Sequence, residues 1–358
     1  MSVNELLLPA RYISSVEKKQ GGFGSVYTFK DLNLDRDVAI KVTQKKSELK
    51  RLGDEISALL KLRSKHVVQV YDVVMGSEDN FGIVMEYIHG NDLFEIKLSD
   101  FSHLERLKLL WQICCGINDI HEVGIIHRDI KPNNMKLDDE GILKIFDFGL
   151  SRESEVNART QGFKGTFGFA APEQYSNGDI NFTKAVDVYA FGVMALYIFT
   201  GSVPLELQKI PPHYNPNFFI NIKELSEYNL LKDLLASCLN LNPTTRPEIS
   251  DIKNELSKAL LFNKHQAVAV INGNTNFLNQ TSPRVNLQLP NIGSFEIHYS
   301  GYDFWIKNAV GEIYMNNIHI SSDQVLVGSC VVALGGASRS PRERSFVTFD
   351  VSTPEVAI

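Results

Sequence analysis

Cysteine is scarce in this chain, which has four thiols among its 358 residues: Cys114, Cys115, Cys238 and Cys330. They show neither the paired spacing of zinc ligands nor the ladder of a disulfide-stapled domain. Cys114 and Cys115 are neighbours in a helical-looking run, 104–121, where buried thiols ordinarily fill core space. We therefore expect a fold held by its apolar core, for which 44% apolar residues suffice.

Positive charge is not in excess either, because 36 Lys and Arg face 42 Asp and Glu, which gives a net charge of −6. A pI near 5.9 disfavours nucleic acid as a main partner. No apolar stretch reaches transmembrane length, and residues 1–10 lack the basic start and long apolar core of a secretion signal. We expect no nucleic-acid partner, no membrane and a cytoplasmic location.

The most informative pattern is the run HRDIKPNN at residues 127–134, which is followed thirteen residues later by DFG at residues 147–149. Transfer of a terminal phosphoryl group depends on aligning the acceptor oxygen and neutralising charge on the nucleotide. Asp129 would orient the acceptor hydroxyl and accept its proton. Lys131 would reach the transferring phosphate from the same loop.

The same pattern contains two candidate metal ligands, Asn134 and Asp147. Their side-chain oxygens suit Mg²⁺, which keeps several waters and takes few protein ligands. Taken singly, each Asp and Asn here would be explained as well by a turn or a cap. The whole set, in this order, predicts phosphoryl transfer in one cleft.

These motifs resemble those of eukaryotic-like serine/threonine protein kinases, and the resemblance runs from the start of the chain to Leu261. It implies an enzyme that uses ATP and Mg²⁺. VAIK at residues 38–41 resembles the strand whose lysine, here Lys41, holds the α and β phosphates. The resemblance pairs Lys41 with Glu55, within a segment, 48–62, that has one apolar helical face. A surface helix with scattered charges is the alternative for Glu55.

The resemblance also outlines a nucleotide pocket. Gly21, Gly22 and Gly24 match the loop over the phosphates, where a missing Cβ lets backbone amides approach phosphate oxygens. Two positions depart from the family: Lys19 replaces its first glycine, and Lys136 stands where an apolar residue forms the floor under adenine. The remaining pocket groups are Val26 and Ala39 as the roof, Glu86 and Ile88 at the hinge, and Asp92 at the ribose.

Residues 147–173 resemble the activation segment of the family, with its Ala-Pro-Glu ending. Lys131 and Thr166 match the serine/threonine branch, so we expect a protein substrate with an aliphatic hydroxyl, and dual specificity stays open. Glu173 would pair with Arg246 as a structural support.

Arg128 adds a positive charge beside the catalytic aspartate, and in related kinases a phosphorylated residue of the activation segment neutralises it. Thr160 is the first candidate for that residue, with Ser151 and Ser154 behind it. We expect a second copy of the chain to carry out this phosphorylation. The alternative is that these hydroxyls only solvate a loop. Asp187 would cap the catalytic loop.

The chain changes character after Leu261. Residues 263–284 are rich in Asn and Gln, which indicates a linker with one short strand at 267–271. In residues 285–358, short apolar strands alternate with turn residues and predict a small all-β sandwich. This region weakly resembles the second half of a forkhead-associated (FHA) domain, which implies a phosphoprotein partner, although the Gly-Arg and Ser-x-x-His signatures are missing.

The expected fold is therefore α+β: a bilobal protein kinase, with a β-rich small lobe at 1–88 and a helical large lobe at 89–262, followed by the β domain. The expected function is ATP-dependent phosphorylation of protein Ser and Thr, with a regulatory or recruiting C-terminal domain. The alternatives are a pseudokinase scaffold, suggested by Lys19 and Lys136, and a small-molecule kinase.

Overall fold

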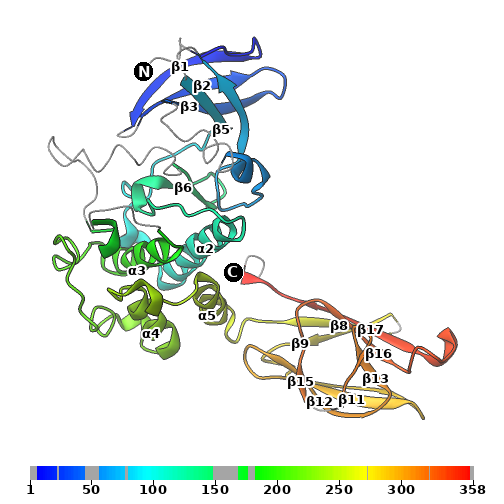
Figure 1. Ribbon diagram of the computed structural model, residues 1–358. Coiled ribbons are helices and arrows are strands. Elements are labelled where there is room, and N and C mark those ends of the chain that lie inside the picture. Colours follow the sequence, from blue (N-terminus) through cyan, green and yellow to red (C-terminus); the bar gives the residue numbers. More distant parts are fainter. Residues whose placement is uncertain are drawn as a thin grey trace. The chain divides into compact units, whose positions relative to one another are not determined.

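The computed structural model describes residues 6–21, 24–44, 56–76, 80–147, 168–175, 182–271, 273–321 and 323–354. The chain divides into two compact units, Met1–Lys253 and Asn254–Ile358. In Figure 1 the elements of the first unit run from blue to green and those of the second from yellow to red.

An antiparallel five-stranded sheet opens the first unit, in the order β1-β2-β3-β5-β4. Its strands are β1 (Tyr12–Gly21), β2 (Gly24–Asp31), β3 (Arg36–Gln44), β4 (Val70–Met75) and β5 (Asn80–Glu86). In β3, Val38, Ile40 and Val42 alternate onto one buried face, as expected for a half-buried strand. Val26 of β2 pairs with Lys41 of β3. The sheet thereby carries two predicted nucleotide-site residues next to each other.

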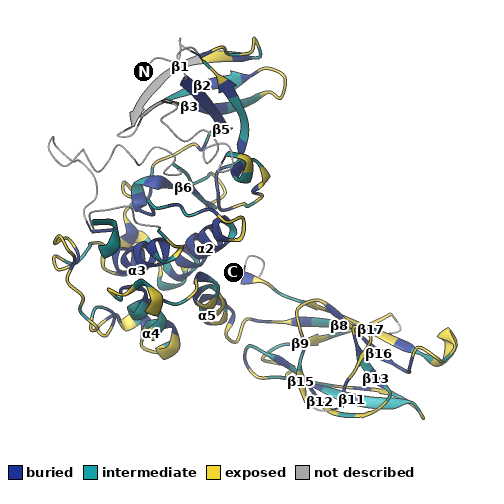
Figure 2. Ribbon diagram, in the orientation of Figure 1, coloured by how far each residue is buried: buried dark blue, intermediate teal, exposed yellow. Residues whose placement is uncertain are grey.

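Helices make up most of the rest of this unit: α2 (His103–Glu122), α3 (Ala185–Thr200), α4 (Asn229–Cys238) and the start of α5 (Ile249–Leu261). α2 begins at a capping box in which Ser102 and Glu105 bond each other's backbone N–H groups. α3 is apolar on all sides and buried from Val186 to Phe199, as Figure 2 shows. A helix of this composition belongs inside a core. The predicted β-rich lobe and helical lobe are both confirmed.

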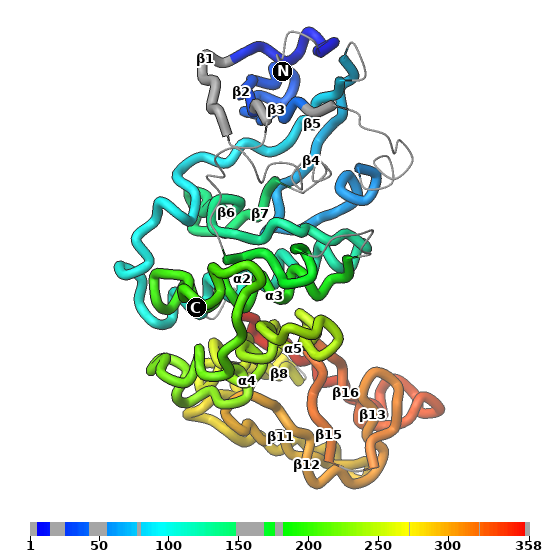
Figure 3. The backbone as a smooth tube through the Cα atoms, turned by 60° about the vertical axis from the view of Figure 1, so that its left-hand side comes forward, coloured from blue at the N-terminus to red at the C-terminus, as the bar shows by residue number. Residues whose placement is uncertain are grey.

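A two-stranded ribbon, β6 (Met135–Leu137) and β7 (Leu143–Ile145), connects these parts. In Figures 1 and 3 it lies between the five-stranded sheet and the helices α2 and α3. The backbone of Ile145 pairs with that of Val67, and Leu93 N donates to Met135 O at 2.9 Å. The residues that flank the ribbon on both sides are those predicted to be catalytic.

The second unit is an antiparallel β sandwich, in agreement with the prediction of a small all-β domain. Four strands form one sheet: β10 (Arg284–Leu289), β11 (Gly293–Tyr299), β12 (Phe304–Gly311) and β15 (Gln324–Val325). Six form the other, in the order β14 (Ile318–His319), β13 (Ile313–Met315), β16 (Cys330–Leu334), β17 (Ser345–Val351), β8 (Ala267–Ile271) and β9 (Asn274–Leu278). Phe295 and Ile306 from one sheet and Val332 and Val347 from the other share one buried cluster.

The prediction of a linker over residues 263–284 was wrong in part. The one short strand predicted there, at 267–271, is present as β8 and pairs with β17 along its whole length, but a second strand, β9, follows it. Asn is common in turns, and two of the five residues of β9, Asn274 and Asn276, are Asn, so the composition resembled a loop. Pairing with a strand some eighty residues later is a long-range contact that local composition cannot reveal.

None of the helices in the described part of the chain combines the length and the apolar composition that a bilayer crossing requires. All four cysteines are buried free thiols. Sγ of Cys114 lies 3.3 Å from the carbonyl oxygen of Ile249, so this thiol packs between α2 and the start of α5.

Candidate active site

The polar run at residues 127–134, here called the catalytic loop, folds around one carboxylate. Nζ of Lys131 lies 2.9 Å from Oδ2 of Asp129, and the two side chains are only 9% and 10% exposed. Nδ2 of Asn134 donates to Oδ2 and to the backbone oxygen of Asp129, each at 2.8 Å. Three of the predicted catalytic residues therefore lie within hydrogen-bonding distance of one another.

Asp187, in the first turn of α3, holds the catalytic loop in place. Its fully buried carboxylate accepts hydrogen bonds from the backbone N–H groups of His127, at 2.8 Å, and Arg128, at 2.7 Å. Nε2 of His121 lies 2.9 Å from its Oδ2. Arg128 has a φ of 66°, a left-handed conformation that non-glycine residues rarely adopt. The predicted cap is confirmed, and it supports the strained backbone next to Asp129.

His127 ties the catalytic loop to the segment that ends in Asp147. Its Nε2 lies 3.1 Å from the carbonyl oxygen of Phe146, and Phe146 N donates to the carbonyl oxygen of Asn134 at 3.0 Å. Burial lowers the pKa of the His127 ring, because a charged imidazolium is poorly solvated there. The ring is therefore neutral at physiological pH.

Asp147 forms an ion pair with Lys41 of β3, between Oδ1 and Nζ. The two side chains are 24% and 12% exposed, so the pair is accessible to a bound molecule. Asp147 has a φ of 67°. Its left-handed backbone turns the chain directly after β7 and directs the carboxylate to the sheet. The acid paired with Lys41 in the described residues is thus Asp147, the predicted metal ligand.

The predicted base pocket lies on β2, β3 and the residues after β5. Val26 is half-buried and Ala39 is buried in the sheet, while Gly21 and Gly24 pair across the β1–β2 connection. The carboxylate of Glu86 is held 2.9 Å from Nζ of Lys144. The side chain of Glu86 therefore has a partner outside the pocket, and only its backbone is available to a base.

Lys136 occupies the predicted floor position, in β6. Its Nζ donates a hydrogen bond of 3.2 Å to the carbonyl oxygen of Ile88 in the hinge. The backbone of Lys136 pairs with that of Asp92. Oδ1 of Asp92 accepts hydrogen bonds from the N–H groups of Phe94 and Glu95, at 3.0 and 3.2 Å. Asp92 therefore closes a turn beside the hinge.

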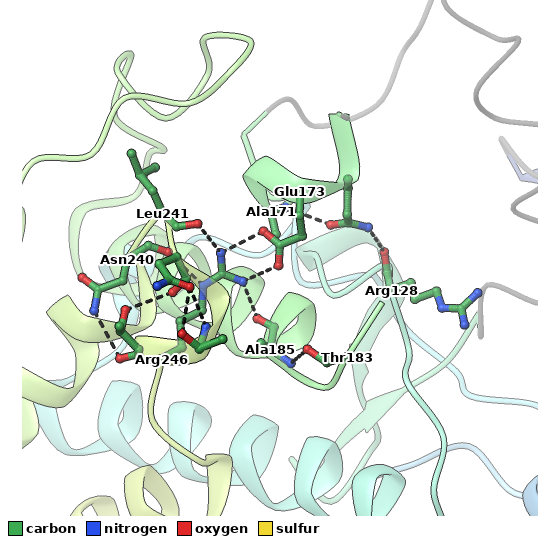
Figure 4. Close-up of polar contacts among 12 residues, drawn as sticks. Arg128, Ala171, Glu173, Thr183, Ala185, Asn240, Leu241 and Arg246 are labelled. Carbon is green, nitrogen blue, oxygen red and sulfur yellow. Dashed lines mark hydrogen bonds and ion pairs between the residues drawn. The ribbon is translucent and has the colours of Figure 1, made fainter. Parts of the chain in front are cut away.

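Glu173 pairs with Arg246 as predicted, and Figure 4 shows the contacts. Both guanidinium nitrogens of the buried Arg246 donate to the Glu173 carboxylate, at 2.6 and 2.9 Å. Arg246 also donates to the carbonyl oxygens of Ala185, at 2.8 Å, and Asn240, at 2.9 Å. The planar fork of arginine suits this bidentate geometry. It joins the end of the activation segment to α3 and the loop after α4.

Two supporting residues were missed by sequence reasoning. Oε1 of Gln174 accepts from Ala171 N at 2.8 Å, and its Nε2 donates to the carbonyl oxygen of Arg128 at 3.2 Å, as drawn in Figure 4. His121 is the second, through Asp187. Gln174 directly follows the Ala-Pro-Glu motif, and His121 lies on the apolar helix that precedes the catalytic loop. Their positions were the only available signal.

Several predicted residues lie outside the described part of the chain, and their roles stay predictions. These are Gly22, Glu55, Ser151, Ser154, Thr160 and Thr166.

Residues 18–256 match the protein kinase domain family. CBL-interacting protein kinase 28 of Oryza sativa subsp. japonica is 28% identical over 334 residues, which cover 86% of this chain and 75% of that protein. The probable serine/threonine-protein kinase pknA2 of Bifidobacterium longum is 34% identical over 220 residues, or 58% of this chain and 29% of that protein. Serine/threonine-protein kinase PrkC of Bacillus subtilis is 33% identical over 196 residues, or 52% and 30%.

The chain spans only part of the length of these relatives. It also covers 53% of the rice CBL-interacting protein kinase 26, which is 32% identical over 265 residues. The family match covers well over half of this chain and contains the catalytic loop, Lys41, Asp147 and the Glu173–Arg246 pair. This chain belongs to the protein kinase family, and its matched region is a serine/threonine kinase domain.

Proposed function

We propose that the chain is an active kinase that transfers the γ-phosphoryl group of ATP to Ser and Thr hydroxyls of proteins. The observation that carries this proposal is the nearly buried Asp129, with Lys131 and Asn134 within 2.9 Å of its Oδ2. Removing a carboxylate and an ammonium from water costs several kcal/mol per ion. A scaffold without catalysis has no use for that arrangement.

Asp129 orients the acceptor hydroxyl and accepts its proton as the phosphoryl group leaves the nucleotide. Lys131 and Asn134 both engage Oδ2. We assign the Asp129 carboxylate to the acceptor hydroxyl. The ammonium of Lys131 also offsets negative charge on the transferring group, since it lies beside the Asp129 carboxylate.

The donor set fits Mg²⁺. Asp147 provides a carboxylate, and both hydrogen bonds of the Asn134 side chain use its nitrogen, so its amide oxygen suits a hard cation. When bound, Mg²⁺ neutralises charge on the phosphates. Lys41, now paired with Asp147, has an ammonium within reach of the same phosphates.

The test compares Asp129→Asn with Asp139→Asn, an exposed acid in the β6–β7 turn that serves as a matched control. Phosphate incorporation from labelled ATP into a protein substrate should fall about 100-fold or more in Asp129→Asn, the scale of general-base assistance. The control should match wild type. Equal incorporation by Asp129→Asn and wild type would favour the pseudokinase scaffold.

Activation by a second copy of the chain is part of the proposal, with Thr160 as the acceptor. The half-buried Arg128 supports it, because its charge next to Asp129 is suited to a phosphate. Mass analysis of proteolytic peptides from the purified protein should find phosphate between residues 147 and 173, and Thr160→Ala should slow activation. A fully active protein without phosphate in that segment would contradict this part.

For the β sandwich we propose recruitment of a phosphothreonine protein, in line with its resemblance to FHA domains. The two-sheet antiparallel architecture supports this assignment. Retention of phosphothreonine peptides by the full chain should exceed that of the same peptides with plain threonine. Equal retention would leave a β module with another partner. The proposed place of action is the cytoplasm.

A further inference from the structure

Two lysines of the β6–β7 ribbon contact the hinge from one face. Lys136 and Lys144 are directly opposite in the antiparallel ribbon, so their side chains point to the same side. Nζ of Lys144 lies 2.9 Å from the Glu86 carboxylate, whereas Nζ of Lys136 donates to the carbonyl oxygen of Ile88 at 3.2 Å. Only the Lys136 contact uses the backbone of the hinge, at Ile88, a residue assigned to base binding.

The two purine bases present different edges to such a hinge. Adenine offers an amino donor followed by the N1 acceptor, which match the carbonyl of Glu86 and the N–H of Ile88. Guanine offers the O6 acceptor followed by two N–H donors. To use the Ile88 N–H through O6, guanine must shift by one position and donate N1–H to the Ile88 carbonyl.

That carbonyl already accepts the Lys136 ammonium. A guanine N–H that approached the same oxygen would lie beside the positively charged ammonium, which repels the like-signed partial charge of the N–H, and a donor left unpaired in a buried site is strongly disfavoured. Ile88 is only 8% exposed, so water cannot easily satisfy the guanine N–H instead. The methylene stem of Lys136 can still cover the adenine face while its ammonium is bound at the hinge.

We propose that Lys136 is a specificity-determining residue, which excludes guanine nucleotides by occupying the Ile88 carbonyl. This inference rests on the proposed nucleotide site. It explains why Lys136 replaces the apolar floor residue of the family, because the Lys136 ammonium at the hinge selects ATP over GTP.

The test measures equilibrium dissociation constants of ATP and GTP, with Mg²⁺, by calorimetry on the full chain. Lys136→Met keeps an unbranched apolar stem and removes the donor, and it should lower the preference for ATP over GTP by about tenfold or more. Lys136→Arg keeps a donor and should retain the preference. Lys144→Met, the matched control from the same ribbon, should change both affinities alike.

An unchanged ATP-to-GTP ratio in Lys136→Met, with a melting temperature like that of wild type, would overturn the inference and leave the proposed function intact. A loss of the preference for ATP in Lys144→Met as large as that in Lys136→Met would also overturn the inference. Wild-type protein that binds neither nucleotide would instead overturn the proposed function.

Discussion

Asp187 is a single carboxylate that fixes the backbone of the catalytic loop. In Asp187→Ala the N–H groups of His127 and Arg128 lose their buried acceptor. Each unsatisfied donor costs about 1–3 kcal/mol, so the loss of both should lower the free energy of unfolding by about 2–6 kcal/mol. Urea titration followed by circular dichroism measures this loss.

Turnover should fall with it, because Arg128 leaves its left-handed conformation and Asp129 moves. Asp233→Ala, on the exposed side of α4, is the matched control and should unfold like wild type. A stable Asp187→Ala protein with wild-type turnover would show that the loop holds its shape without this anchor.

His127 gives the stability a defined dependence on pH. Its pKa is lowered in the folded protein by burial, so at mildly acidic pH the unfolded chain binds more protons than the folded one. The neutral ring therefore contributes fully above its ordinary pKa of 6.5, and this contribution declines as the pH falls below that value. The free energy of unfolding should decrease from about pH 7 to about pH 5.

His127→Gln should make that decrease shallower, as measured by urea titrations at several pH values. The exposed His213 provides the control, since His213→Gln should keep the wild-type slope. A slope that is identical in all three proteins would mean that His127 is not the group responsible.

At the scale of an element, the turn between β12 and β13 depends on Gly311. Its φ is 86°, and a Cβ there would overlap the carbonyl oxygen of Ile292, which accepts the N–H of Glu312 at 3.0 Å. Gly273 also has a positive φ, 79°, but open space around its Cβ position. Gly273→Ala should cost about 1–2 kcal/mol from backbone strain alone.

Gly311→Ala should cost about 3 kcal/mol or more, because the clash adds to the strain. Thermal unfolding of the full chain, followed by near-ultraviolet circular dichroism, compares the two variants. Equal losses would indicate that the turn relaxes away from the Ile292 carbonyl.

Elements whose signal is local were predictable from the sequence. The apolar alternation of β3, the all-apolar α3 and the strands after residue 293 each carry their pattern within about ten residues. β8 was predicted as a short strand, but β9 was not recognised, because Asn274 and Asn276 interrupt its apolar pattern, and the pairing of β8 with the distant β17 was not foreseen. Strand pairing of this range is decided by the whole sandwich core.

In the candidate site, too, contacts between residues close in the sequence were predictable and contacts between distant residues were not. Asp129, Lys131 and Asn134 lie within six residues, so their convergence could be anticipated. The pairing of Lys41 with Asp147, 106 residues apart, was not predicted, because the family resemblance supplied Glu55 as the partner of Lys41. The contact between Lys136 and Ile88 had no sequence signal, since it depends on how the ribbon packs on the hinge.

For the whole molecule, two units with separate cores should unfold in separable steps. The proposed site for ATP with Mg²⁺ lies in one unit only. At about 100 times its dissociation constant ATP should stabilise that unit by about 2.7 kcal/mol and leave the other unchanged. Scanning calorimetry with and without EDTA checks this: removing Mg²⁺ should reverse the shift. A shift of both transitions by the same amount would contradict it.

β17 is an interior strand of its sheet, with β16 on one side and β8 on the other. During translation the sandwich therefore stays incomplete until residue 351 has left the ribosome, whereas the kinase domain is already whole near residue 256. At ordinary rates of elongation this interval is on the order of ten seconds. Newly made chains thus pass through a stage at which the kinase domain is folded and the β sandwich is not. A nonsense mutation between residues 256 and 351 would release the kinase domain without a complete sandwich.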